Sequence, residues 1–569
     1  MNRPKNLLAL IGTLVLLLSL TVPIVQCAPA AEEEVTPPAE EEVTPPAEEE
    51  VTEEEEIKYG GTLVVGWVPG TMVDNIRVGS DWQYTGMGCM FWQMIYDQPW
   101  ILGPAPDYEI LPMLATSWET EDGKTWTFHI REDATFHDGV PVTAEDVAFT
   151  IEYMPIADPS WAFQDIISEP GSIKLIDDYT VQFTLETVIG GPWPACYWVP
   201  VMPKHIFEPY KDAMSEYPND EAIGSGYFKL KEFKPAEYIW FEANEDYWGG
   251  RPYVDEVIWK TYGNIDALYM ALEHGDIDII GYDSCPLLGA EDFRAEGFEI
   301  IESTGLSLIW LSFNLHQDGP MQELDVRKAI MHALDKDKLI DMVYMGHADK
   351  ADSWIYPEMA EYNPNLPQYD VDLDKSNALL DGAGYVDSDG DGIRNDPTTG
   401  KNMEFSMIVS SGSPENIKSA TLSREMLGEV GIAIDMQVLD SGTFYSYLYA
   451  PEEDMYDIAF TGEQPGPKSE WIWEFARSFA GGGGGWNTSY YDNPAFDDAL
   501  NAMTAERDLE KRKELLMDMQ MMIAEDVPYG FLYRRGILNP VSDKFEGYVD
   551  MMGLANWINP WSYYKVHLK

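Results

Sequence analysis

Runs of alternating and of continuous hydrophobic residues divide most of the chain into short predicted strands. Residues 63–68 are almost continuously apolar, as expected of a strand that is buried on both faces. Residues 125–130 alternate Trp126, Phe128 and Ile130 with polar neighbours, and the same alternation returns at Val181 and Phe183. This period of two predicts strands with one face in a core.

Helices are predicted between these strands by apolar residues three and four positions apart. Val147, Ile151 and Met154 form one such stripe, after a capping-box spacing from Thr143 to Asp146. A helix over 265–272 is ended by a glycine and leads to a strand at 277–280. Longer amphipathic helices are predicted over 324–344 and 501–525. Strands that alternate with helices favour an α/β body.

The first 26 residues predict an export signal. Arg3 and Lys5 precede an apolar run over 7–25, and Cys27 follows it directly. The segment resembles a bacterial lipoprotein signal, in which the cysteine is lipidated, although Gln26 stands where a small residue is usual. The alternative is an uncleaved transmembrane anchor. Both interpretations place the body outside the cytoplasm, anchored to the membrane in the periplasm or on the outer face.

Residues 27–56 predict a disordered stalk. The octapeptide EEEVTPPA occurs at 32–39 and again at 40–47, and EEEVTEEEE follows from 48. Repelling glutamates and paired prolines cannot bury apolar surface, so the segment is expected to be extended. It would hold the body away from the membrane.

Composition narrows the function by exclusion. The 569 residues carry 99 acidic against 36 basic side chains, a net charge of −63, which repels nucleic acid. Such acidity would attract cationic solutes, and it equally suits a saline habitat. The four cysteines, Cys27, Cys89, Cys196 and Cys285, are too sparse for a disulfide scaffold. If Cys27 is lipidated, the others can form at most one disulfide.

Five blocks in a fixed order resemble the family 5 extracellular solute-binding proteins, the receptors of ABC importers. The first comprises LPMLATSW at 111–118, DGKTWTFHIR at 122–131, FHDG at 136–139 and TAEDV at 143–147. The next are GSGYF at 224–228 with NEDYWGG at 244–250, and ALEHGDID at 271–278. The last are FN at 313–314 with VRKAI at 326–330 and ALD at 333–335, and DVP at 526–528.

The resemblance implies an α/β clamshell of the periplasmic-binding-protein type, with two large lobes and an inserted small lobe. Residues 57–100, 223–305 and 536–569 would form lobe I, residues 101–222 the inserted lobe II, and residues 306–535 lobe III. The blocks themselves would be mostly architectural. Gly139 and Gly250 suit turns, and Arg327 and Asp335 are expected to pair or to cap.

The sequence offers no catalytic constellation. The eight histidines include no HExxH motif, and neither a G-x-S-x-G elbow nor a P-loop occurs. The chain is therefore expected not to be an enzyme and to require no cofactor, with an extracellular hydrolase as the remote alternative.

One segment predicts a structural calcium ion. Asp387, Asp389 and Asp391 precede Gly392, and Asp396 lies just beyond. The twelfth position from Asp387 is a threonine, whereas an EF-hand has a bidentate glutamate there. A solvated polar turn is the alternative.

The ligand site is expected around residues 456–473. In peptide-binding relatives, the turn that follows the strand corresponding to residues 457–460 carries a tryptophan and an aspartate, and the aspartate anchors the peptide ammonium. The corresponding turn of this chain, TGEQPGP at 461–467, has neither residue. Glu463 could take over the anchoring role, and Trp471 could line the cleft. Trp82 and Tyr84 on the opposing lobe, and Asn314, complete the candidate ligand-binding residues. Core filling is the alternative role of these aromatic residues.

The leading hypothesis is a binding protein that closes its lobes on a peptide-like solute and delivers it to the permease subunits of an ABC importer. The alternative within the same family is an oligosaccharide or metal-chelate receptor, since ring faces stack on Trp and Tyr.

Overall fold

The computed structural model describes residues 57–68, 76–77, 86–104, 108–157, 168–186, 188–190, 199–211, 213, 216–281, 289–316, 318–450, 455–463, 470–478, 486–551 and 559–569. Within these ranges, the side chains at 86–89, 154–157, 304–306 and 470–471 are not described. The segment 57–569 forms one compact unit.

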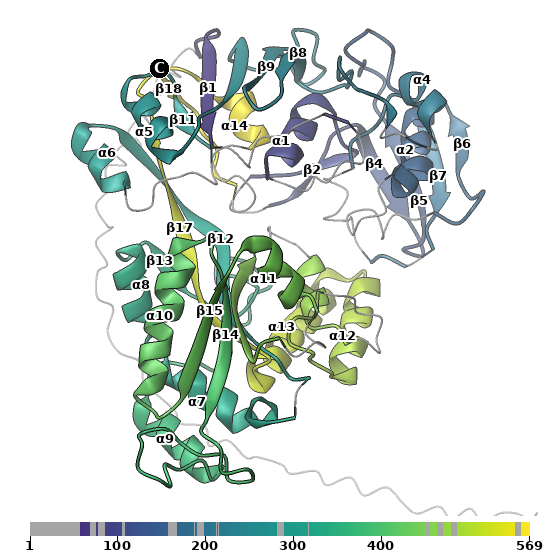
Figure 1. Cartoon of the computed structure of the whole chain (residues 1–569). Coiled ribbons are helices and arrows are strands. Elements are labelled where there is room, and N and C mark those ends of the chain that lie inside the picture. The colour runs from purple at the N-terminus through teal and green to yellow at the C-terminus, as the bar shows by residue number, and fades with distance from the viewer. Residues whose placement is uncertain are drawn as a thin grey trace, which may run out of the picture. The chain divides into compact units, whose positions relative to one another are not determined.

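An eleven-stranded mixed sheet runs through this unit in the order β15-β14-β16-β12-β17-β11-β1-β10-β9-β8, with β13 beside β17 (Figure 1). Its strands are β1 Thr62–Trp67, β8 Phe228–Lys234, β9 Tyr238–Ala243, β10 Glu256–Thr261, β11 Ile279–Ile280, β12 Glu299–Phe313, β13 Ala348–Lys350, β14 Glu404–Ser410, β15 Ala433–Leu439, β16 Ile458–Glu463 and β17 Tyr529–Val541.

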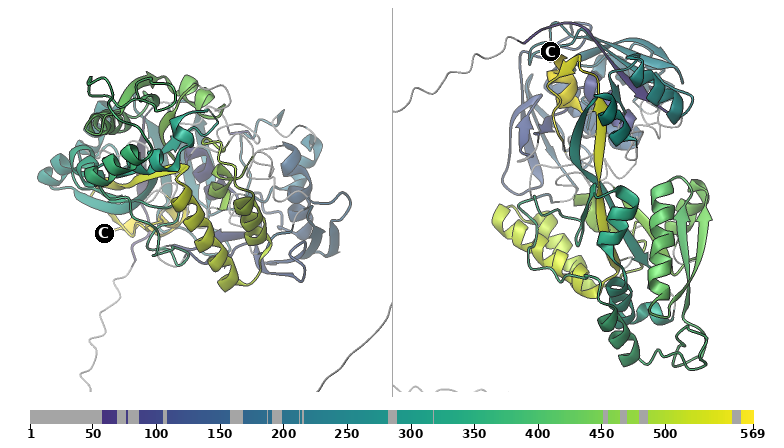
Figure 2. Two further views of the ribbon diagram at one scale, coloured as in Figure 1. Left: turned by 90° about the horizontal axis from the view of Figure 1, so that it is seen from below. Right: turned by 90° about the vertical axis from the view of Figure 1, so that its left-hand side faces the viewer.

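Two parallel regions of this sheet are joined by long antiparallel strands. β1 is parallel to β10 and β11 at one end, and β14 is parallel to β15 and β16 at the other. Between them, β12 pairs antiparallel with β17 over most of their length, with a register shift between Ser303 and Ser307. Figure 2 shows the long β17 passing from one region to the other.

A separate four-stranded sheet, in the order β4-β5-β7-β6, lies within residues 115–184. Its strands are β4 Ala115–Thr120, β5 Thr125–Ile130, β6 Lys174–Asp177 and β7 Thr180–Thr184. The remaining pairs are β2 Trp100–Leu102 with β3 Ile110–Pro112, and β18 Phe545–Glu546 with β19 His567–Leu568.

Helices cover the sheets, as the sequence predicts for an α/β body. They are α1 Gly86–Ile95, α2 Ala144–Ala157, α4 Lys204–Phe207, α5 Ile265–Glu273, α6 Ala290–Glu296, α7 Leu324–Ala333, α8 Lys336–Tyr344, α9 Leu373–Gly382, α10 Pro414–Gly428, α11 Ser441–Leu448, α12 Pro494–Ala505, α13 Leu509–Asp526 and α14 Pro560–Lys565. Short 3-10 turns occur at Glu208–Tyr210, Pro320–Gln322 and Glu470–Phe475.

Several predicted elements are confirmed in detail. β5 spans the predicted residues 125–130, and its Trp126, Phe128 and Ile130 are buried. At the start of α2, Asp146 Oδ2 accepts from the Thr143 amide at 2.9 Å, and Thr143 Oγ1 accepts from the Glu145 amide. This is the reciprocal capping that the spacing predicts.

The two long predicted helices are wrong, because each is interrupted by an aspartate that starts a second helix. Residues 324–344 form α7 and α8, and Asp335 accepts from the Lys338 amide to cap α8. Residues 494–526 form α12 and α13, and Asp508 caps α13 in the same way. A capping side chain satisfies amides that a continuous helix would have bonded internally. The predicted strand 277–280 is also shorter, spanning 279–280.

Arg327 and Asp335 cap as predicted but do not pair with each other. The buried Arg327 guanidinium donates to the carbonyls of Met321 at 2.6 Å, Asp526 at 2.6 Å and Val527 at 3.0 Å. It thereby fixes the C-terminal end of α13 against the start of α7. Gly139 and Gly250 have φ of 87° and 92°, as their predicted turns require.

Candidate functional site

Glu463 is the last residue of β16, where its backbone faces Leu308 of β12. The side chain is partly buried, and its Oε1 accepts a 3.3 Å hydrogen bond from the Tyr449 hydroxyl. Loss of hydration raises the pKa of Glu463 to about 7, and the bond from Tyr449 opposes this shift. A carboxyl group in this state is stabilised in its charged form by an arriving cation.

Two tyrosine rings lie near this carboxyl group, and a tryptophan packs against one of them. The Tyr445 and Tyr449 rings are stacked with centroids 5.9 Å apart and planes 11° apart. Trp486 meets Tyr449 edge-on at 5.4 Å. Tyr445 retains 46% of its exposure, so one face of the cluster is open to solvent. A carboxylate beside aromatic faces suits an organic cation with an apolar body.

The other predicted ligand residues are not brought to this place by the described structure. Trp82 and Tyr84 lie outside the described residues, and Trp471 lies in the 3-10 turn but its side chain is not described. Asn314 is 1% exposed, donates from Nδ2 to the Tyr456 carbonyl and accepts from the His316 amide. The neighbouring Trp473 is buried in an aromatic cluster with Trp310 and Trp354.

Sequence reasoning missed Tyr445, Tyr449 and Trp486. The aromatic density of the segment 444–449, Phe-Tyr-Ser-Tyr-Leu-Tyr, is a visible signal. The sequence alone does not distinguish its exposed rings from the buried Phe444 and Leu448. That distinction requires the knowledge that the segment forms α11 and its C-terminal turn.

Three of the four predicted calcium ligands come together. One oxygen from each of Asp387, Asp389 and Asp391 lies within 4.8 Å of the others, and all three side chains are exposed. Asp387 also accepts from the amides of Gly390 and Gly392. Asp396 accepts from the amides of Thr398 and Thr399 and is not part of the group. The three carboxylates offer the hard oxygens that calcium prefers.

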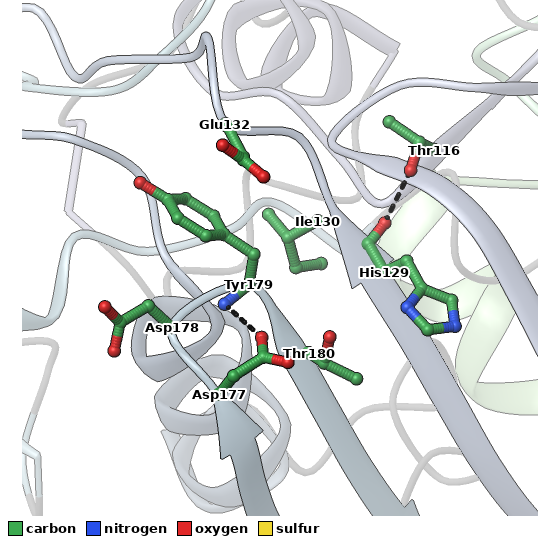
Figure 3. A pocket seen from close by; sticks show the side chains of 8 residues that line it. All are labelled: Thr116, His129, Ile130, Glu132, Asp177, Asp178, Tyr179 and Thr180. Atoms are coloured by element: carbon green, nitrogen blue, oxygen red, sulfur yellow. Dashed lines mark hydrogen bonds between the residues drawn. The ribbon is translucent and has the colours of Figure 1, made fainter.

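An open hollow of about 560 Å³ lies on the four-stranded sheet (Figure 3), to which β16 does not belong. It is lined by Thr116, His129, Ile130, Glu132, Asp177, Asp178, Tyr179 and Thr180. Asp177 accepts from the Tyr179 amide and so shapes the turn between β6 and β7. The carboxylates that line the hollow are exposed, so it is a solvated hollow of the surface. It is formed by other strands than the one that carries Glu463.

Cys27, Cys196 and Cys285 lie outside the described residues, and the Cys89 side chain in α1 is not described. Among the helices that the structure describes, none combines the length and apolarity needed to cross a bilayer.

Two parallel α/β regions joined by a long antiparallel strand pair are the architecture of the periplasmic-binding-protein class. The chain belongs to the bacterial extracellular solute-binding proteins, family 5, whose middle-region profile matches residues 109–487. This confirms the predicted family, and the body is accordingly a solute-binding receptor of the extracytoplasmic space.

Named relatives agree over most of the chain. The oligopeptide-binding protein AppA of Bacillus subtilis is 27% identical over 520 residues, which cover 88% of this chain and 91% of that protein. Its structure in complex with a nonapeptide has a TM-score of 0.70, covering 90% of this chain and 100% of that one. DppA of Helicobacter pylori, in complex with the peptide STSA, is 26% identical with a TM-score of 0.69, covering 90% of this chain and 98% of that one. These likenesses confirm the predicted clamshell class.

Proposed function

We propose that this receptor captures a peptide-like solute through a cationic group at Glu463 and delivers it to an ABC importer. The carrying observation is the partly buried, poorly hydrated Glu463 carboxyl group beside aromatic rings. The oligopeptide- and dipeptide-binding names of the relatives support a peptide, and other relatives carry the name ABC transporter peptide-binding protein.

The charge of Glu463 favours a ligand that carries a cationic group. An ammonium group that enters beside Glu463 gives the carboxylate a charge-assisted hydrogen bond in place of the water that it has lost. Ligands with a cationic group should therefore bind more tightly than neutral ones. The rings of Tyr445, Tyr449 and Trp486 add contact for an apolar side chain next to that ammonium. A peptide amino terminus has both properties.

The test is thermal unfolding of the soluble body, residues 57–569, with trialanine and with N-acetyl-trialanine. The free peptide should raise Tm and the acetylated peptide should not, because acetylation removes the ammonium. A ligand at a hundredfold excess over its Kd contributes about 2.7 kcal/mol. Glu463→Gln should abolish the difference between the two peptides, and the matched Glu463→Asp should retain part of it.

Three other outcomes would contradict the proposal. Stabilisation by cello- or xylo-oligosaccharides but not by peptides would assign the receptor to sugars. Equal response to both trialanine forms would remove Glu463 from the site. A receptor returns its solute unchanged, so mass spectrometry of the recovered trialanine should show no product; steady cleavage would make the chain a hydrolase.

We also propose that the body is tethered through a lipid on Cys27. The support is the basic and apolar leader that ends at this residue, followed by the glutamate- and proline-rich stalk. Cys27→Ala should release the protein from membranes into the soluble extracytoplasmic fraction. A variant that stays in the membrane would favour an uncleaved anchor.

The Asp387, Asp389 and Asp391 group is proposed as a calcium site that braces its loop. The support is the convergence of three carboxylates, with the left-handed Gly390 and Gly392 forming the sharp turns. The ion would supply no step of solute binding.

A further inference from the structure

The connection between α12 and α13 contacts the four-stranded sheet. Exposed Arg507, in this connection, donates from Nη2 to the Thr120 carbonyl at 2.6 Å and from Nη1 to the Glu121 carbonyl. The partners are separated by almost 390 positions in the chain. Both acceptors are backbone oxygens at the turn between β4 and β5, so the contact depends on the arginine and not on the side chains opposite.

A second bond joins α12 to the segment 188–190, which follows β7 in the chain. The Gly190 amide donates to the Thr504 carbonyl at 2.8 Å. Thr504 lies in the last turn of α12, where the backbone carbonyls have no amide donor within the helix. The segment 188–190 thereby caps the C-terminal end of α12.

The fit at Gly190 leaves no room for a side chain. A Cβ placed there would lie 1.9 Å from the Glu506 carbonyl oxygen and 2.5 Å from its carbon. The φ of Gly190 is outside the left-handed region, so an alanine would suit the local backbone. A glycine is required at this position only because the backbone at Glu506 lies so close to it.

The two contacting segments of the small sheet form one unit. The Ile189 amide donates to the Gly123 carbonyl at 2.7 Å, and Asp122 accepts from the amides of Lys124 and Thr125. A rigid turn and the segment 188–190 therefore present the Arg507 acceptors and the Gly190 donor together.

An apolar contact lies along the same boundary. Leu102 of β2 and the nearby Tyr108 are each 4% exposed. They belong to the hydrophobic cluster that contains Phe496 and Leu500 of α12 and Leu516 of α13. The N-terminal part of the chain thus meets the α12–α13 pair through both hydrogen bonds and apolar surface.

We propose that Arg507 and Gly190 form a latch that holds the small sheet against the α12–α13 pair and so stabilises the closed receptor. The chain passes between the β1 region and the β14 region through β12 and β17, and relative motion of the two regions must bend these strands. The four-stranded sheet shares a hydrophobic cluster with β1, and the α12–α13 pair packs on the end of β12 that pairs with β16. A contact between the four-stranded sheet and this helix pair therefore opposes that motion. The latch regulates solute release and in that respect rests on the proposed function.

The experiment is hydrogen–deuterium exchange at the Gly190 amide in the soluble body without solute. Wild type should protect this amide, and Arg507→Ala should accelerate its exchange about three- to tenfold through loss of two hydrogen bonds. Gly190→Ala should accelerate exchange in the Thr504–Asp508 connection. Rapid unprotected exchange of Gly190 in wild type, or an unchanged rate in Arg507→Ala, would overturn the latch.

Matched controls separate the latch from general loosening. Glu121→Ala keeps the accepting carbonyl, so it should leave Gly190 exchange unchanged; acceleration there would point to a side-chain ion pair and contradict the assignment. Gly263→Ala changes a glycine whose Cβ would meet no atom within 4 Å, and it should also be silent.

A second readout uses trialanine. Arg507→Ala should increase its dissociation rate by a similar factor while leaving the preference over N-acetyl-trialanine intact. Protected Gly190 with no trialanine binding would refute the proposed solute and leave the latch standing. Trialanine release unchanged in Arg507→Ala despite faster Gly190 exchange would show that the contact does not regulate release.

Discussion

The indole Nε1 of Trp248 donates a 2.8 Å hydrogen bond to Oδ2 of Asp97, a carboxylate with no solvent exposure. The Tyr247 hydroxyl donates to Oδ1 at 3.0 Å, and burial nevertheless raises the pKa of Asp97 to about 7. The Arg131 guanidinium lies 3.3 Å from the Trp248 ring centroid. The NEDYWGG block thus holds a buried acid between α1 and β2.

Trp248→Phe should destabilise the body by about 1–3 kcal/mol, because Asp97 loses a donor that no water replaces. The folded pKa of Asp97 already exceeds its ordinary value, so its stability contribution falls as pH rises through that interval. Losing the donor raises the pKa further. Urea unfolding should therefore show a larger loss near pH 8 than near pH 5.

The control is Trp310→Phe, which shortens another buried indole whose Nε1 has no hydrogen-bond partner within the described part of the chain. It should lose stability equally at both pH values. A pH-independent loss for Trp248→Phe as well would contradict the role given to its bond with Asp97.

Arg327→Lys should destabilise the body although the charge is kept. A lysine ammonium cannot reach the three carbonyls that the planar guanidinium binds on Met321, Asp526 and Val527. Unsatisfied buried carbonyls predict a loss of about 2–4 kcal/mol by chemical denaturation. Arg424→Lys, on the exposed side of α10, should change stability little. Equal losses of stability in the two variants would show that the three hydrogen bonds of Arg327 do not stabilise the fold.

Glu463→Gln should stabilise the solute-free body at high pH. The folded pKa near 7 exceeds the ordinary 4.5, so the native state holds its proton more firmly and wild type loses stability as pH rises from about 4.5 through 7. Glutamine stays neutral and escapes that loss. The variant should gain about 1–3 kcal/mol near pH 8 and nothing near pH 4. A gain at both pH values would show that charge is not its origin.

Millimolar calcium should raise the Tm of wild type, and chelation by EDTA should reverse the rise. Asp391→Asn should abolish the response because it removes one of three converging carboxylates. Magnesium serves as the control cation and should raise Tm less, because it demands near-ideal octahedral geometry and gives up its water reluctantly. A calcium response that survives Asp391→Asn would place the ion elsewhere.

Much of the fold is predictable because its signals are local. The period-two pattern of Trp126, Phe128 and Ile130 fixes β5, and the Thr143–Asp146 spacing fixes the start of α2. The helix breaks at Asp335 and Asp508 were missed because residues with high helix propensity and apolar positions lie on both sides of each aspartate. An aspartate inside a stripe has the same appearance on a solvated face and at a cap.

The candidate site is less predictable because it depends on distant packing. Glu463 is identifiable as a departure from the family turn, but its raised pKa follows from the loss of hydration that only the folded surroundings impose. Trp473 and Asn314 have the sequence signature of binding residues, yet both are buried in the interior. Aromatic and amide side chains serve cores and ligands alike, so only their surroundings distinguish the two.

The position of β17 in the sheet has a consequence for biosynthesis. β1 lies between β10 and β11, and β11 is covered in turn by β17, which ends at Val541. Ser542 and Lys544 then bind Asp278, whose carboxylate also accepts from the Val64 amide. The earliest strand therefore cannot be fully packed until the ribosome has made almost the entire polypeptide. Such long-range pairing delays folding. An exported chain that folds late reaches the translocation machinery while it is still unfolded.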